Sequence, residues 1–333
     1  MSSPRRDPAD YRILVCDDIS DVGLEELRSA GYDVRNRAGI SRKDLLLELA
    51  EVDVLMVRSR TRVNRQLLRA AERLRLVARA GFPLDTVDVA EATRRGVAVM
   101  HSPTGNEVAA AEFTLGLLLS LARQIPQAAS SMREGRWDKR RLRGLELSGK
   151  TLGVLGMGAV GRNVVQRAVA LQMKVKVHDP GVSAAEIRSV GAESVSWERL
   201  LAQCDFLTVH VSPSERSRGL IGDAAFEHMK DRVRIINCSR GGVIDEEALV
   251  RAIRSGKVAG AAVDVWDDEP ATGSPLLDMR EVICTPHLVA STFEAQINVA
   301  VIVARQVHQF LSTGSADNVV NAADLNARMA SGE

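Results

Sequence analysis

The chain has 333 residues, of which 45% are hydrophobic and 26% charged, a composition typical of folded globular proteins rather than disordered or collagen-like ones. Its 44 Lys and Arg residues against 43 Asp and Glu residues leave a formal net charge of +1, so no global field favours nucleic acid or an anionic membrane. Aromatic residues make up only 3%, which argues against stacking surfaces for single-stranded nucleic acid.

The four cysteines indicate a reducing environment. They form no CxxC pair and no metal-ligand spacing with histidine, and each lies in an apolar run: Cys16, Cys204, Cys238 and Cys284. The first ten residues lack the apolar core of a signal peptide, and the apolar stretch 108–122 is too short to span a bilayer. We therefore expect a cytoplasmic protein with no membrane partner and no metal.

Short apolar runs alternate with amphipathic segments through the first hundred residues. Strands are expected at 13–16, 53–57, 76–78 and 97–100, and helices at 22–30, 65–72 and just before Gly96. Apolar strands joined by helices are typical of a parallel sheet that is buried on both faces. The pattern predicts an α/β domain over residues 6–102, to which residues 295–325, mainly an amphipathic helix at 294–311, are expected to return.

A long apolar helix is expected from Glu107 to Arg123, and a polar connector with six basic residues follows it: Arg133, Arg136, Lys139, Arg140, Arg141 and Arg143. A second series of strands and helices begins at Leu152, with strands at 152–155, 173–177, 206–209, 233–239, 260–265 and 282–285 and a helix at 162–171. The predicted fold class is α/β, with two Rossmann-like, doubly wound parallel-sheet domains and a cleft between them. The second domain is expected at 103–294. The long helix exceeds what one domain face needs, which predicts a homodimer.

The clearest motif is the glycine-rich run GMGAVG at 156–161, which follows a strand and opens a helix. Gly156 permits a tight turn, Gly158 lets the backbone approach a pyrophosphate, and Gly161 lets helix and strand pack closely. An acid, Asp179, stands 18 residues beyond the last glycine, as the dinucleotide-binding fingerprint requires. Its carboxylate is expected to bind the ribose hydroxyls and repel a 2′-phosphate, which favours NAD over NADP. The alternative is a turn residue before Pro180.

Three strands of the second domain are followed by charged residues, where α/β enzymes place their chemistry. Arg240 follows the strand at 233–239, Glu269 lies in the acidic loop after 260–265, and His287 follows 282–285. Taken singly, each also fits an ordinary structural role: a surface ion pair, a loop acid before proline, and a hydrogen-bonded histidine at a strand end.

Seven segments together make the chain resemble a known family: VRSRTRV, ARAG, SPTGNEVAAAEFTLGLLLSLARQIPQA, LSGKTLGVLGMGAVG, INCSRGGVIDEEAL, AGAAVDVWDDEP and TPHLVAST. With them it resembles the D-isomer-specific 2-hydroxyacid dehydrogenases, and among these the phosphoglycerate dehydrogenase branch. The resemblance implies NAD-dependent oxidation of D-3-phosphoglycerate to 3-phosphohydroxypyruvate, the first step of serine synthesis. It also implies a short form that lacks the C-terminal regulatory domain of longer members.

The resemblance implies that Arg240, Glu269 and His287 form the catalytic set. His287 would be the general base, Glu269 would hold its other ring nitrogen and stabilise the imidazolium, and Arg240 would bind the substrate carboxylate or carbonyl. Cofactor contacts are expected from Gly156, Gly158, Ala159, Val160, Gly161, Asp179, His210, Cys238, Ser239 and Asp264. Substrate contacts are expected from Arg58, Ser59, Arg60, Gly81, Phe82, Asn106, Arg240 and His287. The basic connector is either a solvated face or a segment that reaches the partner of a dimer.

The chain departs from the family pattern beside the expected substrate site, at Phe82, Pro83, Thr86, His101 and Val289. Pro83 has no N–H, so one backbone donor of the turn that would cradle the substrate carboxylate is missing. These departures leave the reaction class intact and keep a second substrate open, namely another D-2-hydroxy acid or 2-oxo acid. An alternative of a different class is an NAD-sensing binding protein, like the transcriptional corepressors of this fold.

Overall fold

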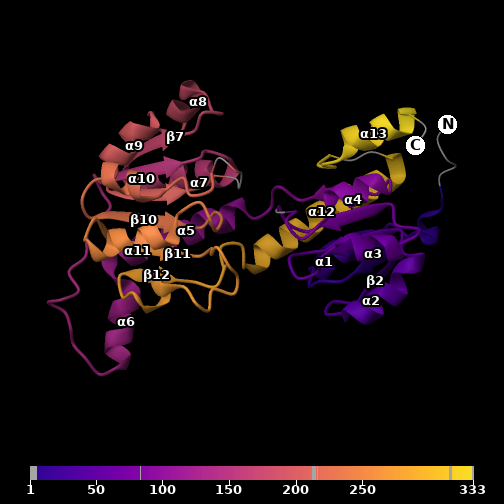
Figure 1. Cartoon of the computed structure of the whole chain (residues 1–333), viewed down its shortest axis with the longest axis horizontal. Helices are drawn as coiled ribbons and strands as arrows, with labels where there is room; N and C mark the ends of the chain where they lie inside the picture. The colour runs from indigo at the N-terminus through magenta and orange to yellow at the C-terminus, as the bar shows by residue number, and fades with distance from the viewer. Residues whose placement is uncertain (1–5, 83, 212–214, 216, 315–316, 332–333) are drawn as a thin grey trace. The chain divides into compact units, whose positions relative to one another are not determined.

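The computed structural model describes residues 6–82, 84–211, 215, 217–314 and 317–331 (Figure 1). The chain forms two compact units, one of Met1–Asn106 with Thr292–Glu333 and one of Glu107–Ser291. The chain thus passes between the units at residues 106/107 and 291/292, a few residues from the expected 102/103 and 294/295.

The first unit is built on a five-stranded parallel sheet in the order β2-β1-β3-β4-β5. Its strands are β1 (Arg12–Val15), β2 (Asp33–Asn36), β3 (Val54–Val57), β4 (Leu76–Arg79) and β5 (Ala98–His101). One face is covered by α1 (Asp21–Ser29) and α12 (Phe293–Thr313), the other by α2 (Arg42–Glu48), α3 (Arg65–Ala70) and α4 (Val89–Arg94). The short helix α13 (Ala322–Ser331) follows a segment that bonds to β5.

The second unit is built on a seven-stranded parallel sheet in the order β12-β11-β10-β9-β6-β7-β8. Its strands are β6 (Thr151–Leu155), β7 (Lys174–His178), β8 (Glu193–Ser194), β9 (Phe206–Val209), β10 (Val233–Asn237), β11 (Val258–Val263) and β12 (Val282–Cys284). One face carries α5 (Glu107–Arg123), α7 (Ala159–Ala170) and α8 (Ala184–Ser189), and the other α9 (Trp197–Gln203), α10 (Asp223–His228) and α11 (Glu246–Arg254). The predicted α/β class, with two doubly wound parallel sheets, is confirmed.

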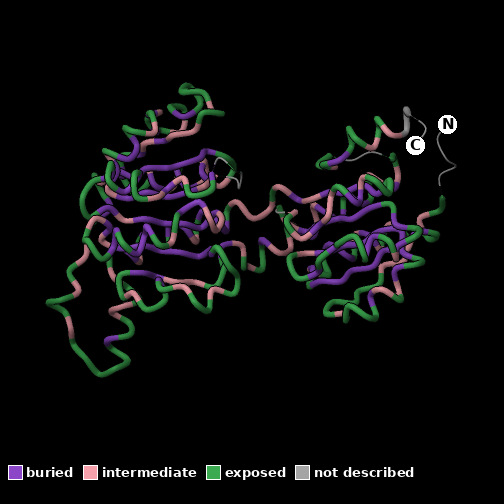
Figure 2. The backbone as a smooth tube through the Cα atoms, in the orientation of Figure 1, coloured by how far each residue is buried: buried purple, intermediate pink, exposed green. Residues whose placement is uncertain are grey.

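Burial explains why the strands are nearly continuous apolar runs. Figure 2 shows that the inner strands of each sheet are buried, whereas most exposed residues lie on the outer helices and loops. The sheet of each unit separates two apolar clusters, one under each helical layer. A strand that is covered on both faces has no polar side to expose, which is the signal that the sequence carries.

Each sheet has one position where the strand order reverses direction, and ligands of such sheets bind at the carboxyl ends of the strands there. In the first unit this switch point lies between β1 and β3, and in the second between β6 and β9. The loop with Arg58 to Arg60 follows β3, and the run GMGAVG follows β6. The fold therefore brings both predicted binding loops to switch points.

The structure differs from the prediction mainly at polar elements. α5 has the predicted bounds, but α7 begins at Ala159 rather than 162, and β10 ends at Asn237, so that Cys238 and Ser239 lie in a loop. The polar connector contains the helix α6 (Ile125–Arg133). The strands β2 and β8 were not predicted because they are short and partly exposed. An edge strand needs no continuous apolar run.

Among the described residues, no helix taken alone is long and apolar enough to cross a membrane. Only α5 and α6 taken together reach the required length and apolarity, and they are bent by 65° at their junction.

The contact between α1 and α12 yields the first prediction. A Cβ at Gly23 would lie 2.5 Å from the carbonyl carbon and oxygen of Ala300, so Gly23→Ala must push the two helices apart. We expect a loss of about 1–3 kcal/mol in the free energy of unfolding, as for other overpacked sites, although alanine favours a helix.

Gly116→Ala in α5 is the matched control. Gly116 is exposed and a Cβ there meets nothing within 4 Å, so the same exchange should stabilise by up to about 1 kcal/mol. Urea unfolding of both variants measures the difference. Equal effects of the two exchanges would contradict the close helix contact.

Candidate active site

The turn after β6 has the shape that a dinucleotide requires. Gly156 has φ +89°, and a Cβ on it would lie 2.6 Å from the carbonyl oxygen of His210. A Cβ on Gly161 would collide with the carbonyl oxygen of Gly156. At Gly158, directly before α7, a Cβ would meet nothing, and this glycine has no side chain that could cap the helix. The open position, with Ala159 and Val160 in the first turn of α7, leaves backbone N–H groups available to a pyrophosphate, which fits NAD.

Asp179 stands directly after β7 and lies beside this turn. Its two carboxylate oxygens accept hydrogen bonds from the backbone N–H of Met157 at 2.7 Å and of Gly181 at 2.8 Å. The carboxylate is therefore fixed next to the glycine run by the backbone itself. This is the position at which the fingerprint places the acid that recognises the adenosine ribose.

His210 follows β9 on the other side of the switch point. The Thr208 hydroxyl and Nε2 of His210 are hydrogen bonded at 2.9 Å. Burial lowers the pKa of His210 to about 4, so the ring is neutral at physiological pH. Cys238 is buried, and burial raises the pKa of its thiol to about 12, which keeps it uncharged. Ser239 donates through its N–H and its hydroxyl to Oδ1 of Asn237.

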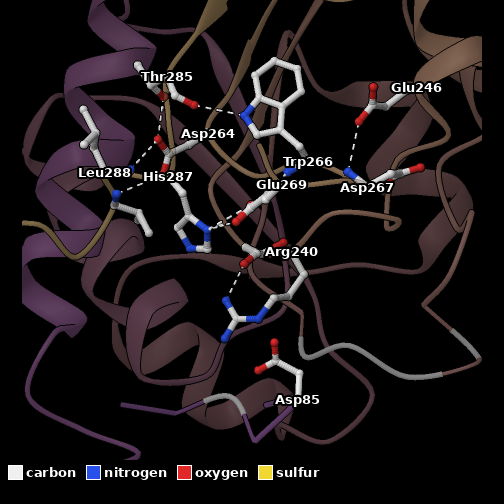
Figure 3. A network of polar contacts seen from close by, with 12 residues as sticks. Asp85, Arg240, Glu246, Asp264, Trp266, Asp267, Glu269, Thr285, His287 and Leu288 are labelled. Carbon is white, nitrogen blue, oxygen red and sulfur yellow. Dashed lines mark hydrogen bonds and ion pairs between the residues drawn. The ribbon is translucent and has the colours of Figure 1, made fainter. Parts of the chain in front are cut away.

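The three residues of the predicted catalytic set follow three neighbouring strands. Arg240 follows β10, Glu269 follows β11 and His287 follows β12, and these strands are paired in that order. Nδ1 of His287 lies 2.9 Å from both carboxylate oxygens of Glu269. Figure 3 shows the imidazole facing this carboxylate, with Arg240 beside the pair. Because a carboxylate only accepts, Nδ1 carries the proton and Nε2 of the neutral ring keeps its lone pair.

A buried carboxylate holds the loop that carries His287. Asp264 is fully buried and accepts from the Thr285 hydroxyl at 2.5 Å and from the N–H groups of Leu288 and Val289 at 2.8 and 2.9 Å. His287 itself has φ +55°, a left-handed backbone angle that residues other than glycine rarely adopt. The sequence predicted Asp264 as a cofactor contact. In the structure its carboxylate binds groups of this loop.

Close backbone contact fixes Arg240 and Glu269 relative to each other. A Cβ on Gly241 would collide with the carbonyl oxygen of Trp266, so only glycine lets the loops after β10 and β11 approach this closely. The N–H of Trp266 donates to Oε1 of Glu269 at 3.3 Å, and its indole N–H donates to the Thr285 carbonyl at 3.1 Å. Nη1 of Arg240 donates to the Ser239 carbonyl at 2.5 Å.

In the first unit, the predicted substrate loop after β3 is fastened to Asp17, which the sequence analysis missed. This buried acid accepts from the N–H of Arg58 at 2.6 Å, from the N–H of Thr61 at 3.1 Å and from the Thr61 hydroxyl at 2.6 Å. Nε of Arg60 lies 3.4 Å from the same carboxylate, and Ser59 is exposed. The signal for Asp17 was its place directly after the apolar run of β1. Asn106 stands directly before α5, at its N-cap position.

Three of the departures from the family pattern, Phe82, Thr86 and His101, lie around Arg79, a buried arginine at the end of β4. Nη1 of Arg79 donates to the Thr86 hydroxyl, and the ring of Phe82 meets that of His101 edge to face at 5.2 Å. Burial and then the charge of Arg79 lower the pKa of His101. Gly81 has φ +141° and is followed by Phe82, while Pro83 lies outside the described residues. Val289 is buried and bonded to Asp264.

The chain is similar to known dehydrogenases in sequence. A family model described as D-isomer specific 2-hydroxyacid dehydrogenase, NAD binding domain, matches residues 115–289. D-3-phosphoglycerate dehydrogenase from Archaeoglobus fulgidus is 42% identical over 311 residues, which cover 93% of this chain and 59% of the relative. The protein of the same name from Rattus norvegicus is 43% identical over 316 residues, covering 95% and 59%. The chain thus spans less than two thirds of the length of these relatives.

Solved structures show the same fold. The TT0316 protein from Thermus thermophilus has a TM-score of 0.84 and 30% identity, covering 93% of this chain and 100% of that one. A glyoxylate reductase from Paecilomyes thermophila has a TM-score of 0.83 and 29% identity, covering 93% and 98%. The resemblance read from the sequence motifs is confirmed.

The second prediction concerns His210. Folding lowers the pKa of this histidine from an ordinary value of 6.5 to about 4, so the ring takes up a proton on unfolding as soon as the pH falls below 6.5. Its contribution to stability is therefore complete above pH 6.5 and is lost progressively down to pH 4. The loss amounts to up to about 3 kcal/mol.

Denaturant unfolding of wild type and His210→Gln at pH 7.5 and pH 4.5 measures this contribution. The variant should lose less stability than wild type between the two pH values, because glutamine does not titrate. An identical loss in both proteins would mean that His210 is not buried in its neutral form.

Proposed function

Because the chain belongs to the D-isomer specific 2-hydroxyacid dehydrogenase family, we propose that it oxidises D-3-phosphoglycerate to 3-phosphohydroxypyruvate with NAD. The observation that carries the proposal is the pairing of His287 Nδ1 with both oxygens of Glu269. These residues and Arg240 follow three successive strands of the sheet, β12, β11 and β10. The choice of substrate is supported by relatives of that name at 42% and 43% identity.

In the proposed reaction the secondary hydroxyl of the substrate becomes a carbonyl. When bound, NAD accepts the hydride that leaves the carbon. Nε2 of His287 takes the hydroxyl proton, and the Glu269 carboxylate at Nδ1 stabilises the imidazolium that results. In the reverse direction the same imidazolium returns the proton. Glu269 also fixes the ring, since both of its oxygens lie at the same distance from Nδ1.

Arg240 is proposed to bind the substrate carboxylate with its planar guanidinium. The side chain is half-buried and its Nη1 is held by the Ser239 carbonyl, so its remaining N–H groups have a restricted direction. Arg58, Ser59, Arg60, Gly81, Phe82 and Asn106 are proposed to contribute substrate contacts from the first unit. The bound dinucleotide would lie against Gly156 to Gly161, Asp179, His210, Cys238, Ser239 and Asp264. Residues 6–102 with 295–325 would then be the substrate-binding domain, and 103–294 the NAD-binding domain.

A second candidate is the same chemistry on another D-2-hydroxy acid or 2-oxo acid. The specific observation in its favour is the altered surrounding of Arg79, where Phe82, Thr86 and His101 depart from the family pattern. The glyoxylate reductase with the same fold at 29% identity is a relative of this kind. A corepressor-like protein that binds NAD without turnover is the alternative outside enzymes.

A homodimer is also part of the proposal. Apolar side chains are exposed at positions that share one face of α5 and one face of α6: Val108 and Leu119, and Ile125 and Met132. Trp137 in the following connector is 78% exposed. A second copy of the chain is the simplest cover for such a face, and light scattering at micromolar concentration tests it. A cytoplasmic location, inferred from the four free thiols, belongs to the same proposal.

The central test is NADH formation with D-3-phosphoglycerate, D-lactate and D-glycerate, followed for wild type, His287→Ala and Glu269→Gln. Wild type should prefer D-3-phosphoglycerate. His287→Ala should lower kcat by about 100- to 10,000-fold, because the positioned base is lost, while NADH binding by fluorescence stays near normal. Glu269→Gln should move the acidic limb of the pH profile to lower pH, because an amide stabilises the imidazolium less than a carboxylate does.

Unchanged turnover in His287→Ala would contradict the assignment of the base. Turnover of another hydroxy acid in preference to D-3-phosphoglycerate would select the second candidate. Tight NADH binding by wild type with no turnover of any of these acids would select the binding protein.

Cofactor preference is predicted from Asp179. Its carboxylate, held beside the glycine run by Met157 and Gly181, should repel the 2′-phosphate of NADP and favour NAD strongly. Asp179→Ala should narrow the ratio of kcat/KM for NAD over NADP, since ribose bonds and repulsion vanish together. Asp179→Asn is the control that retains a hydrogen-bonding side chain without the charge. Equal efficiency of wild type with both cofactors would refute the assignment.

A further inference from the structure

A cavity of about 530 Å³ opens in the first unit, at the sheet edge opposite the predicted substrate loops. Its wall includes Arg75 and Ala98, which stand at the amino ends of β4 and β5. The substrate loops follow the carboxyl ends of the strands of this sheet. The length of a strand, four residues or about 13 Å, separates the two edges. The cavity is therefore not part of the site described above.

The floor of the cavity is apolar and its rim is basic. Leu74 and Ala98 are buried beneath it, and Phe310 and Leu325 line it from α12 and α13. The lining also includes four arginines and no acidic residue from the described part of the chain: Arg75, Arg94, Arg95 and Arg328. A pocket of this size suits a small molecule, since such pockets measure about 300–1,000 Å³.

Two of the arginines that line the cavity have no neutralising acid among the described residues. Among the residues that the structure describes, neither Arg75 nor Arg95 forms an ion pair. Nη1 of Arg75 donates to the hydroxyl of Tyr11 at 3.2 Å, and its guanidinium lies 5.7 Å from the centroid of that ring. A neutral partner holds the side chain in place and leaves its charge available. Arg94, in contrast, is paired with Glu91.

The wall formed by α13 is fixed to the sheet by one buried side chain. Asn321, directly before α13, donates to the Thr93 hydroxyl and to the Val97 carbonyl, both at 2.9 Å, and accepts from the N–H of Val99 at 2.9 Å. Nη1 of Arg328 donates to the Thr93 carbonyl at 2.8 Å. The cavity is thus bounded by elements that hydrogen bonds hold together, so little order has to be gained on binding.

From these features we propose that the cavity is a second binding site, for a small organic anion with an apolar body, such as an alkyl phosphate. Its phosphate would be bound by Arg75 and Arg95 at the rim, and its hydrocarbon part would cover Leu74, Phe310 and Leu325. Arginine suits this role because its planar donors match phosphate oxygens. The proposal does not depend on the proposed reaction, because the cavity lies away from the predicted substrate loops and its test measures binding, not turnover.

Isothermal titration calorimetry of the full chain at low salt, in buffer without phosphate, tests the site with three probes. Hexyl phosphate should bind saturably at one site per chain, more tightly than inorganic phosphate or hexanol, because only hexyl phosphate engages both the rim and the floor. Arg75→Ala and Arg95→Ala should each weaken its affinity by about three- to fivefold, the size expected for exposed charge pairs, and the double variant by about tenfold or more.

Three further measurements make the result specific. Ala322→Phe should weaken hexyl phosphate binding, because the larger side chain fills the cavity without changing a charge. This variant tests the site even if an arginine variant fails to fold. Lys43→Ala, on an exposed helix away from the cavity, should leave the affinity unchanged. Saturating NAD should also leave it unchanged.

The proposal is overturned if hexyl phosphate shows no saturable binding. It is equally overturned if the double arginine variant binds as wild type does. Loss of binding in Arg60→Ala or under saturating NAD, with the cavity variants unaffected, would place the ligand at the substrate loop or the dinucleotide turn instead.

Discussion

His287 adopts a left-handed backbone conformation that residues other than glycine rarely adopt, and the position of its imidazole beside Glu269 depends on that conformation. Such a residue costs about 1–3 kcal/mol and persists only where its surroundings hold it. Asp264 supplies the hold, because its buried carboxylate accepts from both N–H groups that follow His287 and from the hydroxyl two residues before it. An ionised carboxylate that lost these partners inside the protein would cost far more than the strained backbone does. Relaxing the backbone at His287 would therefore cost more free energy, through the lost hydrogen bonds of Asp264, than it would recover.

The first unit uses the same device at its own switch point. Asp17 is buried after β1 and binds two N–H groups and one hydroxyl of the loop that carries Arg58 to Arg60. In both units a short, buried acid at a strand end organises a loop whose exposed residues are available for chemistry. A carboxylate suits this role because it only accepts and has room for several donors, whereas a loop has backbone N–H groups to satisfy. The other residues of each loop can then remain exposed, because the buried acid holds the loop in place.

Much of this arrangement could be predicted because it follows from apolar periodicity and from glycine. The strands buried on both faces, the run GMGAVG and the charged residues after β10, β11 and β12 all left direct signals in the sequence. The anchoring role of the two acids was not predicted. Asp17 and Asp264 each follow an apolar run, and no local pattern distinguishes an acid that binds a distant loop from one that faces water. The edge strand β2 and the connector helix α6 were missed for a related reason, because partly exposed elements lack a continuous apolar signal.

Three of the departures from the family pattern, Phe82, Thr86 and His101, form one connected group of contacts and are not independent changes. In the sequence, Phe82, Thr86 and His101 are far enough apart to look independent. In the structure they meet around the buried guanidinium of Arg79: Thr86 accepts from it, and His101 lies near enough for the charge of Arg79 to lower its pKa. Burial lowers that pKa further, so the His101 ring is neutral beside the arginine, and Phe82 packs against the ring edge to face. An arginine that is buried in this way needs acceptors rather than a second cation. The effects of substitutions at residues in contact are not additive, so restoring one of the three to the family residue would also disturb the contacts of the other two. The residues around Arg79 thus form one cluster of mutually dependent contacts, and a role of this cluster in substrate choice, as proposed above, would depend on all of its members together.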